Sequence, residues 1–83
     1  MAEHLEIGDC VKLTAVPPEV ARDGHRFPDT LAVFRSAVGC RFRVRGLDEY
    51  GHAELWVCED GSEAKTGTAH TIWVEPEYLA NED

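Results

Sequence analysis

Apolar and polar side chains alternate along two neighbouring stretches in the middle of the chain, residues 41–45 and 52–57. Because the side chains of a β-strand point alternately to its two faces, each stretch predicts a strand with one apolar and one polar face. Residues 48–51 lie between them and contain the Asp and Gly that tight turns favour. The segment 39–58 therefore predicts a β-hairpin. Its apolar face would carry Phe42, Val44, Ala53, Leu55 and Val57.

The alternation also predicts a register for this hairpin, across a four-residue loop. In that register Arg45 lies opposite Glu54 as an ion pair, and Arg43 lies opposite Trp56 as a cation–π pair. A shift of one residue would bring apolar side chains opposite charged ones, so the pattern favours this pairing. An isolated hairpin is marginal in water, so the rest of the chain must cover its apolar face.

Further strands are predicted on either side of the hairpin. Residues 10–16 alternate in the same way and are followed by two prolines, which cannot donate to a sheet ladder. Residues 70–74 form the last clear strand, and a short final piece at 78–79 follows a proline-containing turn. Residues 19–27 are polar and mixed, and they predict a loop.

One short α-helix is predicted at about residues 30–38, where apolar residues recur at helical spacing. Asp29 or Thr30 is a suitable N-cap, and Gly39 is the expected residue just past the C-terminal end. A helix of this length is not stable alone, so we expect it to dock on the sheet. Its apolar stripe would consist of Leu31, Phe34, Ala37 and Val38.

The length of 83 residues suits one domain, residues 1–83, with a thin core. We expect frayed tails at residues 1–6 and 80–83. Residues 59–69 are mostly polar and contain glycine, and they predict a mobile loop.

Charge and cysteine usage limit the classes of partner and compartment. Sixteen acidic residues against eight basic ones give a net charge of −8. Such a chain is repelled by phosphate backbones and by anionic membrane surfaces, so the composition disfavours nucleic acid and membranes as partners. The sequence contains no transmembrane span and no signal peptide, and its three cysteines are odd in number and widely spaced. These features predict a cytoplasmic protein with reduced thiols.

Three segments together resemble small bacterial SH3-like and KOW-type domains: residues 7–13, 39–57 and 72–79. The first contains Gly8-Asp9-x-Val11, which is similar to the entry into the first strand of those domains, and the last contains Pro76-x-Tyr78, which is similar to the end of eukaryotic SH3 domains. The resemblance implies a mainly β fold, a small SH3-like β-barrel of about five short strands, with the one short α-helix before the central hairpin. It also implies a non-enzymatic protein-interaction module or accessory subunit.

The polar face of the predicted hairpin is the strongest candidate for a functional site. Three arginines form a local positive stripe, and a tryptophan beside them adds a flat apolar surface; both residue types are enriched in binding hot spots. The first hypothesis is a docking face for another protein with an acidic or mixed surface. The alternative is a solvated sheet face whose pairs serve strand stability and solubility. The candidate binding residues are Arg41, Arg43, Arg45, His52, Glu54, Trp56 and Trp73.

Two further hypotheses concern partners. The same residues would suit RNA or single-stranded nucleic acid, as in KOW-like domains, because arginines interleaved with aromatics favour stacking on bases. We also expect a monomer, or a weak homodimer formed through an exposed strand edge.

Metal binding and catalysis are disfavoured by spacing. Zinc sites usually show close ligand pairs such as C-x₂-C, and the chain has none, so we expect no metal and no cofactor. His52 with Glu54, or His70 with Glu75, are residue types suited to acid–base chemistry, but no phosphate loop, nucleophile elbow or paired-carboxylate signature accompanies them. We therefore expect no enzyme. The dispersed residues weighed as metal ligands are Cys10, Cys40, Cys58, His4, His25, His52 and His70.

Overall fold

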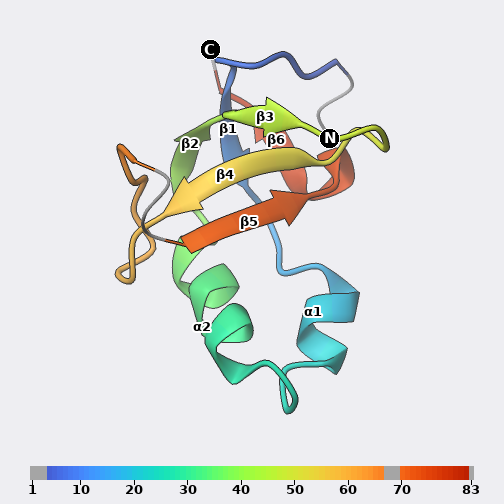
Figure 1. Cartoon of the computed structure of the whole chain (residues 1–83), viewed down its shortest axis with the longest axis vertical. Helices are drawn as coiled ribbons and strands as arrows, with labels where there is room; N and C mark the ends of the chain where they lie inside the picture. Colours follow the sequence, from blue (N-terminus) through green and yellow to red (C-terminus); the bar gives the residue numbers. More distant parts are fainter. Residues whose placement is uncertain (1–3, 67–69, 83) are drawn as a thin grey trace.

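Six short strands gather at one end of the molecule and two α-helices at the other (Figure 1). The computed structural model describes residues 4–66 and 70–82. Its elements, in chain order, are β1 (Cys10–Leu13), α1 (Pro18–Arg22), α2 (Pro28–Ala37), β2 (Arg41–Arg43), β3 (Gly46–Leu47), β4 (Ala53–Val57), β5 (His70–Val74), the 3₁₀ helix η1 (Pro76–Tyr78) and β6 (Leu79–Asn81).

The strands form two three-stranded antiparallel sheets, with orders β2-β1-β6 and β3-β4-β5. The fold is therefore small and mainly β, as the alternation predicts. In the first sheet β1 is central and pairs with the last strand of the chain, so Lys12 lies opposite Ala80. In the second sheet β4 is central, and Glu54 lies opposite Trp73 of β5.

The two sheets share one bent strand. Only Val44 and Arg45 separate β2 from β3, and the backbone of each residue bonds to a different sheet. The Val44 N–H donates to the Asp9 carbonyl at 2.8 Å, while the Arg45 N–H donates to the Glu54 carbonyl at 2.9 Å. The predicted hairpin over residues 39–58 is therefore correct only in its inner half, because β2 pairs with β1 rather than with β4.

The predicted hairpin register is wrong by one residue, since Gly46 lies opposite Glu54 and Leu47 opposite Ala53. The predicted register requires residues 41–45 to continue beside β4. They leave that sheet at the bend, so their apolar side chains need no partner across from them on β4. The connection closes through Asp48, whose N–H donates to the His52 carbonyl at 3.1 Å.

The α2 helix confirms the predicted helix, but its N-cap and its buried stripe differ from the prediction. Its N-cap is Phe27, and Pro28 occupies the first turn, so Asp29 and Thr30 lie inside the helix rather than capping it. A proline is favoured there because the first helical N–H groups have no partner in any case. Gly39 confirms the expected C-terminal position, with a φ of 88° and its N–H donating to the Leu13 carbonyl at 2.8 Å.

The buried stripe of α2 is rotated from the predicted one: Val33, Phe34 and Ala37 are buried. Val38 is 39% exposed because it is the C-cap, with an extended ψ of 130°, and no longer follows helical spacing. Leu31 is half-buried and packs against Gly24, where an added Cβ would overlap the leucine side chain.

Residues 18–22 form α1, so the loop predicted over residues 19–27 is wrong in its first part. The two prolines begin this helix and do not end the first strand, because β1 stops at Leu13 and the strand predicted over residues 10–16 is three residues too long. The single Pro17 carbonyl accepts the N–H groups of both Val20 and Ala21, at 3.0 and 3.2 Å, and Pro18 lies in the first turn.

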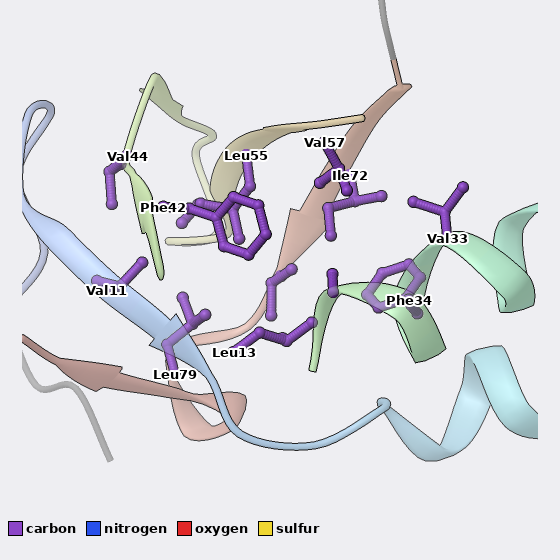
Figure 2. Close-up of a cluster of buried hydrophobic side chains, with 13 residues drawn as sticks. Val11, Leu13, Val33, Phe34, Phe42, Val44, Leu55, Val57, Ile72 and Leu79 are labelled. Carbon is purple, nitrogen blue, oxygen red and sulfur yellow. The ribbon is translucent and has the colours of Figure 1, made fainter. Parts of the chain in front are cut away.

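A single apolar core lies between the sheets and extends to α2 (Figure 2). Phe42 is 1% exposed and lies among side chains from both sheets, while Val33 and Phe34 close the end of the core that faces the helices. Burying one such aromatic side chain contributes about 2–3 kcal/mol. The other buried members are Val11, Leu13, Ala37, Val44, Ala53, Leu55, Val57, Ile72, Val74 and Leu79.

The ends of the described chain are packed or paired. Ala80 and Asn81 belong to β6, and the Glu82 N–H donates to the Cys10 carbonyl at 2.9 Å, so the tail predicted over residues 80–83 is paired as far as Glu82. Leu5 packs against the core. Residues 1–3, 67–69 and 83, which belong to the predicted tails and loop, lie outside the described residues.

Candidate functional site

The outer face of the β3-β4-β5 sheet carries two tryptophans. Alternation along β4 buries Ala53, Leu55 and Val57 and turns Glu54 and Trp56 outward. On β5 the same face carries Trp73, which is 46% exposed. Trp56 lies opposite Thr71, two residues from Trp73, so the two tryptophans are diagonal neighbours. Diagonal neighbours in a sheet are within reach of aromatic side chains.

Trp56 is held in place by a charged network. The Cζ atom of Arg45 lies 4.6 Å from the centroid of the Trp56 ring. The indole Nε1 donates to Oε2 of Glu54 at 2.8 Å. The arginine Nη2 lies 3.8 Å from Oε2 of Glu63. The face of the Trp56 ring therefore contacts the Arg45 guanidinium, and its indole N–H contacts the Glu54 carboxylate. We call Arg45, Glu54, Trp56 and Trp73 the Trp face.

Two pairings predicted within this face are wrong. Arg45 rather than Arg43 forms the cation–π pair with Trp56, and Glu63 rather than Glu54 provides the carboxylate for Arg45. Both errors follow from the bend after β2. The bend shifts the register of β3 on β4 by one residue, and it places the Arg45 side chain over Trp56.

Glu63 is the residue that sequence reasoning missed. It forms an isolated bridge with Val57, and its side chain accepts the backbone N–H of Arg43 as well as contacting the Arg45 guanidinium. The chain around it is fixed by Gly61, whose φ is 92° and whose Cα lies so close to the Ser36 carbonyl that a Cβ would overlap it. No alternation pattern could reveal Glu63, since it lies in a polar stretch 18 residues from Arg45.

The described part of the predicted mobile loop, residues 59–66, is bonded to β4. The Ala64 N–H donates to the Trp56 carbonyl at 2.9 Å, and Ala64 is 4% exposed. The Cys58 N–H donates to the Ser62 carbonyl at 2.8 Å. Residues 59–66 therefore lie beside β4, where Glu63 contacts Arg45 of the Trp face.

The three arginines do not form one free stripe. Arg41 lies in the other sheet, and its Nε is 3.7 Å from Oε1 of Glu82. Arg43 donates from Nη1 to the Gly8 carbonyl at 2.8 Å. Of the arginines predicted for the site, the structure thus brings only Arg45 onto the Trp face, and two of the three have carboxylate partners.

His52 lies at the margin of the face and contacts carboxylates other than the predicted Glu54. Its Nδ1 is 2.9 Å from Oδ2 of Asp48, and its Nε2 is 3.7 Å from Oε1 of Glu75. Desolvation raises the pKa of the Asp48 carboxyl, but the N–H groups of His52 and Tyr50 and the nearby imidazole together lower it below its ordinary value. The arrangement stabilises the turn before β4, because Asp48 accepts both N–H groups, at 2.9 and 2.7 Å.

The remaining candidates are dispersed. His70 lies 4.0 Å from Glu59 through its Nε2 atom, not beside Glu75 as the sequence suggested. Cys40 is half-buried at the rim of the core rather than fully buried, with its Sγ 3.8 Å from the Ser36 carbonyl oxygen. Within residues 4–66 and 70–82, no group of three or more His, Cys, Asp or Glu side chains is placed to hold a metal ion.

Comparison of the chain with protein-family models, with curated proteins and with solved structures finds no match. Neither helix in the described part of the chain has the length and apolar character needed to cross a bilayer. A functional assignment must therefore rest on the geometry of the Trp face itself.

Proposed function

We propose that this chain is a non-enzymatic protein-interaction module or accessory subunit that docks another protein on its Trp face. The observation that carries the proposal is Trp73, a large aromatic side chain left 46% exposed on the outer face of the β3-β4-β5 sheet. Tryptophan and arginine are enriched in binding hot spots, and tryptophan buries a large area with only two rotatable side-chain bonds. Trp56 is its diagonal neighbour and Arg45 covers the Trp56 ring, so the Trp face contains both types.

Preorganisation of the face supports this function. The Trp56 ring is stacked under Arg45, and its indole N–H is bonded to Glu54, so both are already ordered before any partner arrives. Ordering such side chains on binding would otherwise cost about 0.5–1.5 kcal/mol each. A face that is fixed in advance is suited to recognising a complementary surface.

The charges of the face define the surface of the partner. Arg45 lies between Glu63 and the ring of Trp56, and Glu54 lies directly opposite Trp73. Charged groups of both signs thus lie on the Trp face, Glu54 opposite the exposed Trp73 and Arg45 over the ring of Trp56. The partner that fits is a protein with an apolar contact point for Trp73 and charged groups of both signs around it.

We also propose an SH3-like β-barrel as the finer description of the fold. Three features support it: the pairing of the first strand with the last, the bent strand shared between two sheets, and the 3₁₀ helix η1 immediately before β6. The helices occupy the connection between the first two strands. Domains of this class serve many functions, so the fold adds no functional argument of its own.

The nucleic-acid alternative finds less support in the geometry. Single-strand binding needs a continuous basic groove beside its aromatics. Arg41 and Arg45 have carboxylate partners at 3.7 and 3.8 Å, in a chain of net charge −8. We keep this alternative as an outcome of the experiment below.

The experiment compares immobilised wild-type protein with Trp73→Ala and with Phe27→Ala. Phe27 is also an exposed aromatic, 55% exposed, but it lies at the helical end of the molecule. Proteins captured from a lysate of the source cell are quantified for all three. We expect at least one protein to be captured by the wild type and Phe27→Ala but not by Trp73→Ala.

Capture that is equal for all three proteins would refute the proposal. In parallel, a fluorescent single-stranded oligonucleotide is titrated into the same three proteins. Binding of the oligonucleotide that is lost only in Trp73→Ala would replace protein docking with the nucleic-acid alternative.

A further inference from the structure

The strand β5 has one unpaired edge. In the sheet β3-β4-β5 it pairs with β4 alone, and no strand of the described chain covers its other side. The peptide groups that face this edge can be identified from the bonds of β4. The Glu54 carbonyl accepts the Arg45 N–H, and the Trp56 carbonyl accepts the Ala64 N–H, so both residues direct their peptide groups away from β5.

Peptide groups alternate in direction along an antiparallel strand, so the other residues of β4 bond to β5. Their partners across the ladder are His70, Ile72 and Val74. Thr71 and Trp73 therefore point their N–H and C=O groups to the open edge. Both residues are exposed, and no backbone hydrogen bond from outside the sheet reaches either one in residues 4–66 and 70–82.

A groove runs beside this edge, between β5 and α2. It consists of two adjoining hollows, of about 340 and 110 Å³, which share Asp29, Val33 and His70. Val33 and Ile72 form an apolar floor, 7% and 5% exposed. The other lining residues are Thr30, Ala32, Ser36, Glu59 and Thr71. We call this hollow the β5–α2 groove.

We propose that the β5–α2 groove binds an extended peptide segment that carries a basic residue, and that this segment adds as a fourth strand beside β5. Strand addition uses main-chain hydrogen bonds for affinity and alternate side chains for specificity. Here Thr71 and Trp73 provide the main-chain groups. An alternate side chain of the segment would enter the groove over Val33 and Ile72.

Charge complementarity identifies the segment as basic. Asp29 and Glu59 line the groove, and the Glu59 side chain is 94% exposed, so it is free to turn toward a ligand. Among the described residues that line the two hollows, none is Lys or Arg. A Lys or Arg of the segment would thus meet two carboxylates, Asp29 and Glu59, with only His70, 4.0 Å from Glu59, as a neighbouring basic side chain.

Charge also argues against a second copy of this chain as the occupant. Pairing of β5 with β5 of another molecule would bring two chains of net charge −8 together along an edge lined by Asp29 and Glu59. Like charges placed together in this way disfavour association.

This site goes beyond the proposed docking function and does not depend on it. The Trp face uses the Trp73 side chain, whereas the β5–α2 groove uses the Trp73 peptide group and side chains of α2 together with His70, Thr71 and Ile72. A substitution of the indole should leave the groove intact, so the two proposals can be tested separately.

The probe is a library of randomised nine-residue peptides displayed on phage and selected on the immobilised wild-type protein. We expect the selected peptides to be enriched in Lys or Arg alternating with apolar residues. Titrated into ¹⁵N-labelled protein, they should shift the Thr71 and Trp73 backbone amide signals and slow the hydrogen exchange of both. No selected peptide, or selected peptides without basic residues, would overturn the proposal.

Thr71→Pro tests the strand-addition step. The Thr71 N–H points to the open edge, so proline removes a donor for the peptide without removing a bond to β4, and prolines are tolerated at strand edges. We expect peptide affinity to fall about tenfold, while the control Thr71→Val, which keeps the N–H, stays near the wild type. Equal binding by both variants would refute strand addition.

Two further measurements keep the test decisive if Thr71→Pro does not fold. Asp29→Asn combined with Glu59→Gln should weaken peptide binding about fivefold, whereas Asp23→Asn combined with Glu49→Gln, outside the groove, should not.

Two outcomes would contradict the proposal. Peptides whose binding is lost in Trp73→Ala but not in the Asp29 and Glu59 variant would lie on the Trp face. A wild-type dimer in sedimentation that Thr71→Val retains and Thr71→Pro loses would identify a second copy as the occupant instead.

Discussion

Arg45 and Glu63 lie 18 positions apart in sequence, yet the arginine Nη2 is 3.8 Å from the glutamate Oε2, and the same guanidinium covers the ring of Trp56. This contact connects the segment after β4 to the bend between the two sheets. The order of the Trp face therefore depends on a residue outside the strands that carry the face.

Arg45→Met should remove the charge and keep most of the packing over Trp56. We expect the free energy of unfolding to fall by about 1 kcal/mol, because a partly desolvated cation–π pair and its carboxylate contact are lost. Urea denaturation measures the loss, and the Trp emission maximum should move to longer wavelength. The matched control is Arg41→Met, whose side chain is 71% exposed and should change stability by less than about 0.5 kcal/mol. Equal effects of the two variants would contradict this account.

Gly61→Ala should be far more damaging than Gly51→Ala. Both glycines have positive φ, 92° and 84°, so each alanine pays the backbone cost of about 1–2 kcal/mol. An alanine at 51 meets no atom within 4 Å, whereas its counterpart at 61 would overlap the Ser36 carbonyl. The resulting displacement should cost at least about 1 kcal/mol more. Urea midpoints of the two variants provide the comparison, and indistinguishable midpoints would show that the segment does not press against α2.

Phe34→Ala should destabilise the chain by about 3–5 kcal/mol, because it opens a cavity where α2 closes the core. Val38→Ala should cost less than about 1 kcal/mol, since Val38 is 39% exposed at the end of the helix. Thermal or urea unfolding with circular dichroism detection distinguishes them. A larger loss at 38 than at 34 would contradict the burial of Phe34 in the core and the exposure of Val38.

Glu77→Gln should stabilise the chain at neutral pH. A hydrogen bond with Glu75 raises the pKa of the Glu77 carboxyl above 4.5, and desolvation and the charges of Glu75 and Glu19 raise it further. The folded state therefore binds this proton more tightly than the unfolded chain, so the wild type gains stability as the pH falls through the raised pKa, and the gain is complete below 4.5. The advantage of the neutral glutamine should accordingly be present well above the raised pKa and vanish below 4.5.

Urea denaturation at several pH values checks this dependence. Glu49→Gln, an exposed glutamate in the connection before β4, provides the control for the loss of one negative charge. An advantage of Glu77→Gln that persisted unchanged at low pH would show that it does not arise from the Glu77 carboxylate.

Local patterns predicted much of the fold because local physics determines those parts. Alternation in residues 53–57 matches the observed burial of β4, and helical spacing near Phe34 located α2. Pro17 and Pro18 are predicted to end a strand over residues 10–16, which is wrong because β1 already ends at Leu13; their restricted φ instead starts α1.

The pairings on the candidate site were not predictable from local patterns. The bend at Val44–Arg45 is defined by backbone bonds to Asp9 and Glu54, which are distant in sequence. Alternation identifies which side chains share a face, and it did so for Glu54 and Trp56. It carries no information on where a strand leaves one sheet for another, so the partner of Arg45 could not be found.

The segment that contains α1 and α2 begins and ends at backbone positions that are hydrogen-bonded neighbours. The Gly39 N–H bonds to the Leu13 carbonyl, and the Leu13 N–H bonds to the Cys40 carbonyl, so residues 14–38 leave and rejoin the strands through one closed pair. Because loop closure depends only weakly on loop length, this segment can lengthen, shorten or change its sequence without altering the pairing of β1 with β2. One requirement limits that freedom: any replacement must still place an aromatic side chain where Phe34 closes the core. Variation among related chains should therefore concentrate in the helices, and grafting of new segments should succeed there before it succeeds anywhere in the sheets.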